Sequence, residues 1–396
     1  MTNEFIRGSI YMTAGLLVAG SLGFVYHVLA ARLLGTNGYG ILSFIFFMIM
    51  VVGSTVGYGL MQTISKQISE NNEVPAIYLS LVIAGITGII LLVIGKFANW
   101  IGYTPIYIIF VISAIVFILL NVLQGILQGY RRMDLIAIVT VAINVFKVIF
   151  LVILVYLLNM GTFGGVATLL FSYVIISVIL FLFVYLNRLI NLKYNGNILN
   201  VLKSFLFIVS TRLFLCILLF FPPVLLKIVG GSYDDVAKFT AAFSVSKYVI
   251  YFFQGILISF FPNFVLVVKS DSKLEQKYAQ YGLSFAMLAG LVLVAFSYFF
   301  GVDAVEIIYG SEFILPDIDT FTIFSSVGIF MISMLLNDIY IAKSNYKKLL
   351  SVWIISSLGL LFALYLFDSP LHKVEYGILI YSIFSMVLLL LSYLKD

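Results

Sequence analysis

The chain has 396 residues, of which 63% are hydrophobic and 10% are charged, and its mean hydropathy is +1.18. A soluble globular protein carries about 25% charged residues, so this composition excludes that class. The formal net charge of +5 says little by itself, and the single cysteine, Cys216, excludes both a disulfide framework and a cysteine-based metal site.

Apolar runs follow one another along the chain, and each of them is long enough to cross a hydrocarbon core of roughly 30 Å. They predict an all-α polytopic membrane protein with about twelve transmembrane helices. The helices are expected at residues 8–33, 38–64, 75–97, 104–129, 134–158, 162–187, 203–230, 236–268, 278–300, 316–342, 347–367 and 374–394. The first of these runs is too long for the hydrophobic region of a signal peptide.

A polar stretch near the midpoint divides the predicted helices into two groups of six. Residues 191–202 are expected to form a cytoplasmic linker between an N-terminal lobe, 1–190, and a C-terminal lobe, 203–396. Most lysines and arginines between the helices fall on the side that holds both chain ends, so the positive-inside rule predicts cytoplasmic termini. We therefore expect a multi-pass protein of the cell membrane, the plasma or inner membrane.

The first predicted helix carries small residues at every fourth position, Gly15, Ala19 and Gly23, a pattern typical of close helix packing or of a bend. His27 follows in the same helix, where two roles are open: a packed, hydrogen-bonded residue or a proton relay. Arg32, near the predicted external end, either gates a cavity or lies at the membrane interface.

The fourth and fifth predicted helices carry amides and a lysine. Asn121, Gln124 and Gln128 share one helical face, and Asn144 lies on the next helix. These amides either bind the hydroxyl groups of a sugar or form hydrogen bonds between helices. Lys147 lies roughly 22 Å along the helix from the cytoplasmic Arg132, too far for its side chain to reach the interface, so we expect it to face a wet or polar interior.

The seventh and eighth predicted helices each contain one further cation. Arg212 either reaches the cytoplasmic interface or faces a cavity. Pro222 and Pro223 either end the seventh helix early or form a hinge. Lys247 shares a face with Tyr251 and Gln254, which predicts a polar neighbour for this stripe.

Carboxylates are scarce inside the predicted helices. Asp338 is the one that lies well inside a span, where it neutralises one cation or is held beside Lys343 at the cytoplasmic end. The predicted interior is therefore cationic, as an anionic substrate requires. A diphosphate would supply the missing charge, with Arg as a forked donor and Lys as a point charge.

One segment recurs in the two halves of the chain. NVLQGILQGYRR, from Asn121 to Arg132, is matched by NDIYIAKSNYKK, from Asn337 to Lys348, and the repeat predicts a duplicated membrane unit. Its paired cations are read as topology determinants, and a contact with a lipid-linked diphosphate at the cytoplasmic entrance is also open. These cations are Arg131, Arg132, Lys347 and Lys348.

Three stretches resemble one family. ARLLGTNGYGILSF (Ala31 to Phe44) resembles the turn after the first helix of polysaccharide-export flippases of the Wzx type, with Gly35, Gly38 and Gly40 allowing a tight external turn. LQGYRRMDLIAIVTVAINVFKVI resembles the junction between helices four and five of that family, and IIYGSEF (Ile307 to Phe313) its motif before helix ten.

The family belongs to the multidrug/oligosaccharidyl-lipid/polysaccharide (MOP) exporter superfamily, which also contains the MATE drug antiporters. The resemblance implies two six-helix lobes related by a pseudo-twofold axis, a central cavity that is cationic in the flippase branch, alternating access and a bent seventh helix.

The expected function is translocation of a polyprenyl-diphosphate-linked oligosaccharide to the outer leaflet, for assembly of cell-surface polysaccharide or glycan. The alternative is a MATE-like cation-coupled drug or metabolite antiporter, against which the missing carboxylates of the N-terminal spans count. A membrane glycosyltransferase or polysaccharide polymerase ranks last, because the first external turn carries no acidic residue.

The expected partners are the lipid-linked substrate, the bilayer and glycan-assembly enzymes such as a polymerase or glycosyltransferase. We expect a monomer that binds no nucleic acid. No cofactor or metal is expected, because the chain has only His27 and His372 and lacks a phosphate-cradling Gly-Lys-Ser/Thr loop. A coupling ion, H⁺ or Na⁺, remains open.

Overall fold

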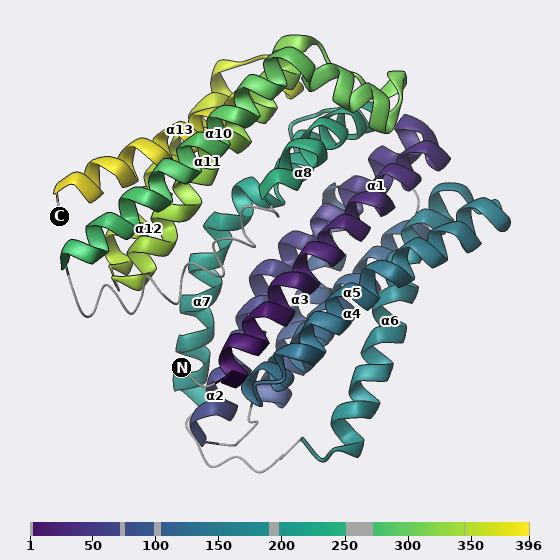
Figure 1. Ribbon diagram of the computed structural model, residues 1–396. Helices are drawn as coiled ribbons and strands as arrows, with labels where there is room; N and C mark the ends of the chain where they lie inside the picture. The colour runs from purple at the N-terminus through teal and green to yellow at the C-terminus, as the bar shows by residue number, and fades with distance from the viewer. Residues whose placement is uncertain are drawn as a thin grey trace. The chain divides into compact units, whose positions relative to one another are not determined.

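The structure, a computed structural model, describes residues 3–71, 76–98, 104–189, 198–250, 272–343 and 345–395. Within these ranges the chain forms helices joined by short turns, with no strand (Figure 1). The predicted all-α class is confirmed. The residues divide into two compact units, which we call unit 1, Met1–Val224, and unit 2, Leu225–Asp396.

Unit 1 holds the elements up to the start of α8. They are α1 (Asn3–Val52), the π-helical segment η1 (Gly53–Gly57), α2 (Tyr58–Asn71), α3 (Ala76–Ala98), α4 (Thr104–Gly129), α5 (Met133–Leu151), the π-helical segment η2 (Val152–Leu157), α6 (Gly161–Leu186) and α7 (Ile198–Leu219). The unit boundary runs through α8 (Pro222–Ile228). The division into lobes at 191–202 stays a prediction, and in the structure α7 packs on α2 and η1 inside unit 1.

Unit 2 follows the boundary in α8. Its described elements are a helical stretch at 233–250, α10 (Ser272–Tyr309), the 3-10 turn η3 (Ser311–Phe313), α11 (Asp317–Ala342), α12 (Tyr346–Leu366) and α13 (Pro370–Lys395). The four long helices of this unit run beside one another (Figure 1). In its core, the rings of Phe330, Trp353 and Tyr381 lie against one another, and Ser333 and Ser385 hydrogen-bond at 2.9 Å.

Eight described helices are long and apolar enough to cross a membrane. The first, Tyr11–Ser69, has 59 residues and is therefore long enough for two crossings. A shorter apolar helix, Ser80–Val93, belongs to α3. These helices make the chain a multi-pass membrane protein, whereas the division into twelve spans and the side on which each terminus lies stay predictions.

The chain turns back on itself at Gly35, inside α1. Gly35 has φ 67° and ψ −179°, a backbone conformation that is essentially restricted to glycine. In one continuous helix His27 and Phe46 would lie about 28 Å apart, yet their ring centroids are 4.7 Å apart. The predicted turn is confirmed at Gly35, but Gly38 and Gly40 are helical, and the turn does not use them.

Small residues allow close helix packing in unit 1. A Cβ atom on Gly15 would lie 2.7 Å from Cβ of Ala137, and one on Gly23 would lie 3.3 Å from Oδ1 of Asn144. Gly15 and Gly23 thus let α1 approach α5, which confirms the packing predicted for this row. Gly125 of α4 likewise approaches the backbone of α2, since a Cβ there would lie 2.7 Å from the carbonyl oxygen of Met61.

Both copies of the repeated segment end one helix and start the next, as predicted. The first copy ends α4 at Gly129 and turns through Arg131, which has φ 58°, into α5. The second copy ends α11 at Ala342 and begins α12 at Tyr346. Similarly, α7 ends at Leu219 and α8 begins at Pro222, so the two prolines lie in the first turn of a helix, where their missing N–H groups cost least.

Candidate functional site

Lys147 lies inside unit 1, against the part of α1 that precedes the turn at Gly35 and the part that follows it. Its side chain is on α5 and only 5% exposed. Its Nζ atom is 5.5 Å from the centre of the Tyr26 ring and 5.1 Å from the centre of the Phe46 ring. Among the described residues no carboxylate pairs with it. Ring faces attract a desolvated cation by about 2 kcal/mol, which offsets only part of the cost of a charge inside a membrane.

Hydrogen bonds across unit 1 hold Tyr26, a neighbour of Lys147, and His27, whose ring lies against Tyr26. The hydroxyl of Tyr26 lies 3.0 Å from Oγ1 of Thr168 on α6. Nδ1 of His27 lies 3.1 Å from the hydroxyl of Tyr39, across the turn at Gly35. His27 is thus a buried, hydrogen-bonded residue of this interior, and its role as a proton relay stays a prediction.

A second group in unit 1, which we call the polar strip, consists of Tyr58, Gln62, Asn121, Gln128 and Arg212. Arg212 of α7 donates a hydrogen bond to the Tyr58 hydroxyl, and its guanidinium carbon lies 3.8 Å from the centre of the same ring. Nε2 of Gln62 donates to Oε1 of Gln128 across 3.3 Å.

Asn121 joins the polar strip through Gly57, the residue before Tyr58. A Cβ atom on Gly57 would lie 3.0 Å from Nδ2 of Asn121, so the absence of a side chain lets the amide approach η1. Asn121 also donates to the carbonyl oxygen of Phe117, at 2.8 Å. Two predicted site residues, Asn121 and Arg212, therefore contact adjacent residues, Gly57 and Tyr58, at the junction of η1 and α2.

The remaining predicted residues are not gathered into these two groups. In unit 1, Gln124 is half-buried, Asn144 donates to the carbonyl of Thr140 at 3.0 Å, and Arg32 is exposed. In unit 2, Lys247 is buried with Nζ 5.5 Å from the Phe243 ring, and Asp338 accepts a hydrogen bond from Asn337 at 3.3 Å. Tyr251 and Gln254 lie outside the described residues.

The cations of the repeated segment are at the surface. Arg131, Lys347 and Lys348 are exposed, and Arg132 forms an exposed ion pair with Asp134 at 3.2 Å. Such pairs contribute little to stability.

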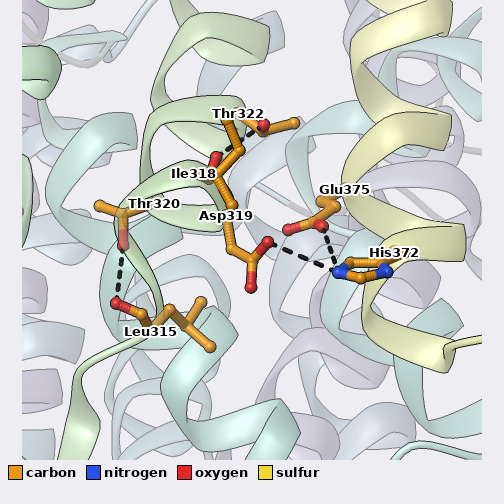
Figure 2. A network of polar contacts seen from close by, with 7 residues as sticks. All are labelled: Leu315, Ile318, Asp319, Thr320, Thr322, His372 and Glu375. Carbon is orange, nitrogen blue, oxygen red and sulfur yellow. Dashed lines mark hydrogen bonds and ion pairs between the residues drawn. The ribbon is translucent and has the colours of Figure 1, made fainter.

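Sequence reasoning missed one polar cluster, in unit 2 (Figure 2). Nε2 of His372, on the first turn of α13, lies 3.6 Å from Oδ1 of Asp319 on α11 and 3.6 Å from Oε1 of Glu375, one turn further along α13. Both carboxylates are buried. The spacing of His372 and Glu375, three residues apart at a helix start, is a signal that pairs them, but only the packing of α11 on α13 adds Asp319.

Unit 1 thus presents one buried cation, Lys147, and one half-buried cation, Arg212, and the sequence offers them little compensation. The acidic residues of this unit are Glu4, Glu70, Glu73 and Asp134, and those within described helices lie at helix ends. Such an interior can attract an anion, with Lys147 as a compact point charge and Arg212 as a planar, multidentate donor.

Residues 5–268 match the model of a family described as "Polysaccharide biosynthesis protein". No functionally curated protein matches the sequence.

Solved structures with a similar fold are transporters of the MOP superfamily. An inward-facing multidrug resistance MATE transporter shares 17% identity and a TM-score of 0.74, covering 98% of this chain and 97% of its own. A MOP superfamily transporter from Pyrococcus furiosus, for which the reverse polarity of the binding pocket suggests a different function, shares 17% identity and a TM-score of 0.70, covering 98% of this chain and 94% of its own. A point mutant of the Vibrio cholerae MATE transporter VcmN shares 16% identity and a TM-score of 0.66, covering 99% and 96%.

Proposed function

Because the chain belongs to the polysaccharide biosynthesis protein family of the MOP superfamily, we propose that this membrane transporter moves a polyprenyl-diphosphate-linked oligosaccharide between the two leaflets. The diphosphate binds to Lys147 and Arg212 of unit 1, and the sugar hydroxyls meet the amides of the polar strip. Alternating access, expected of the superfamily, opens the interior to one side of the membrane and then to the other.

The observation that carries this proposal is the uncompensated charge of Lys147. A cation that is 5% exposed and has ring faces as its described neighbours lacks a counter-charge, and a phosphate group provides one. An exporter of cationic drugs gains nothing from such a charge, because the substrate and the site would repel each other.

The test measures flipping of a fluorescent polyprenyl-diphosphate oligosaccharide in proteoliposomes. The variants Lys147→Met, Arg212→Gln and Lys247→Met remove one charge each and keep most of the side-chain volume. Lys277→Met and Arg188→Gln are matched controls, because Lys277 and Arg188 are exposed.

Loss of flipping in the Lys147 and Arg212 variants, with wild-type rates in the controls, is the expected result. Wild-type rates in both the Lys147 and the Arg212 variants would overturn the cationic mechanism. A wild-type protein that flips no lipid-linked oligosaccharide would overturn the proposed substrate.

The similarity in fold to MATE transporters favours a second candidate function, cation-coupled export of a drug or metabolite. It is distinguished by dye efflux driven by an imposed H⁺ or Na⁺ gradient in the same proteoliposomes. Gradient-driven efflux without lipid flipping would select this function over the first.

A further inference from the structure

The cluster of Asp319, His372 and Glu375 places two carboxylates and one imidazole around a common point. All three ligand atoms lie within 4.8 Å of one another. In Figure 2 the Glu375 and Asp319 side chains point toward the same ring nitrogen of His372, from α13 and α11 respectively. None of these residues belongs to the groups that carry the proposed function, and the inference does not rest on that function.

The two carboxylates are buried without enough hydrogen-bond donors. Glu375 is 0% exposed and Asp319 is 3% exposed. Both oxygens of Glu375, and Oδ1 of Asp319, accept no hydrogen bond from any residue that the structure describes. Two desolvated carboxylates side by side repel each other when both are ionised, and one half-exposed imidazole offers at most one positive charge. Such a pair takes up either a shared proton or a cation, and the geometry of the cluster suits a cation.

We propose that Asp319, His372 and Glu375 bind one divalent transition-metal ion of the Zn²⁺ or Mn²⁺ class. One imidazole nitrogen with two carboxylate oxygens is a donor set that suits such ions. Ligand atoms about 2.1 Å from a tetrahedral ion are about 3.4 Å from one another, and the two distances from Nε2 of His372 are 3.6 Å. The side chain of His372 is 45% exposed, so the cluster is not enclosed by the described residues on this side.

The bound ion would tie the start of α11 to the start of α13. It would also replace the repulsion between Asp319 and Glu375 with two attractive contacts. This inference departs from the sequence-based expectation that the chain uses no metal. That expectation rested on the small number of histidines and cysteines and did not consider a cluster of one histidine with two carboxylates.

The test uses the full chain, purified in detergent with a tag that contains no histidine and stripped of metal by a chelator. Zn²⁺ alone, and then Mn²⁺ alone, is titrated calorimetrically, and the bound metal is counted by elemental analysis. The variants are Asp319→Asn, Glu375→Gln and His372→Ala. Asp317→Asn is the matched control, because this acid lies in the same first turn of α11 but is exposed.

Wild type should bind one equivalent of metal, and each cluster variant should bind at least about tenfold more weakly, as loss of a direct ligand requires. The control should bind as wild type does. The melting temperature separates this result from misfolding: metal should raise it in wild type, whereas Glu375→Gln without metal should melt no lower than metal-free wild type and should not respond to metal.

Either of two outcomes would overturn the proposal. One is a wild-type chain that takes up no equivalent of either metal, which would mean that the two carboxylates share a proton instead. The other is a set of cluster variants that bind metal as tightly as Asp317→Asn does.

Discussion

The guanidinium carbon of Arg212 lies 3.8 Å from the centre of the Tyr58 ring, and the same guanidinium donates a hydrogen bond to the Tyr58 hydroxyl. One tyrosine thus holds the cation through two interactions of different physical origin, ring-face attraction and a hydrogen bond.

These two interactions can be separated by substitution. Tyr58→Phe keeps the ring face and should lower the initial rate of oligosaccharide flipping two- to fivefold, the equivalent of about 0.5–1 kcal/mol for one hydrogen bond. Tyr58→Leu removes both interactions and should lower it at least about tenfold. If both variants flip at the wild-type rate, Tyr58 does not position Arg212 for transport.

Replacing Lys147 with methionine should raise stability while it abolishes transport. The substitution removes a charge that costs roughly 3 kcal/mol inside a membrane and gives up a ring-face attraction of about 1–2 kcal/mol. The net gain of about 1–2 kcal/mol should appear as a higher melting temperature in detergent. Lys277→Met, at an exposed position of α10, should change neither quantity, and a destabilised Lys147→Met protein would contradict the assignment of an uncompensated charge.

Gly125→Ala should destabilise unit 1, because its new Cβ would lie 2.7 Å from the backbone carbonyl oxygen of Met61 and would force α4 and α2 apart. Overpacking of this kind costs about 1–3 kcal/mol. The matched control is Gly85→Ala in α3, where no atom beyond the local helix backbone lies within 4 Å of the new Cβ. That control should be neutral or more stable by up to about 1 kcal/mol from helix propensity. Thermal unfolding followed by the intrinsic fluorescence of the protein compares the two.

Gly35→Ala tests backbone strain alone, since no atom beyond the local backbone lies within 4 Å of the position that its Cβ would take. The conformation at φ 67°, ψ −179° should cost about 1–3 kcal/mol with any side chain. Asparagine tolerates the left-handed helical conformation but not the conformation of Gly35, whose ψ is near 180°. Gly35→Asn should therefore be as destabilised as Gly35→Ala. A stable Gly35→Asn protein would contradict the geometry of the turn.

The helices of this fold could be predicted from the sequence because the apolar runs are long enough to cross a membrane and short polar segments separate them. Local chemistry was also sufficient at Gly35, where only glycine takes the required conformation, and along Gly15 and Gly23, whose spacing marked the contact with α5. Gly38 and Gly40 were assigned to the same turn because sequence proximity alone cannot separate turn glycines from helical ones.

The candidate site could be predicted only in part. The cost of a charge in a membrane pointed to a shielded position for Lys147, but a wet or polar surrounding was expected, whereas its described neighbours include the rings of Tyr26 and Phe46. Tyr58 was missed because nothing in its own helix marks it as the partner of Arg212, which lies on α7. The cluster of Asp319, His372 and Glu375 was not predicted for the same reason: the contact of Asp319 with the other two residues depends on how α11 packs on α13.

The only cysteine of the chain lies where α7 meets the π-helical segment η1. Sγ of Cys216 is 2.9 Å from Oγ of Ser54, and the thiol is shielded from water. The wild-type protein therefore carries a single built-in reporter, and its rate of labelling by a maleimide measures how often α7 separates from η1. A rate that changes when lipid-linked oligosaccharide is added would reveal motion of this contact during transport without any engineered residue.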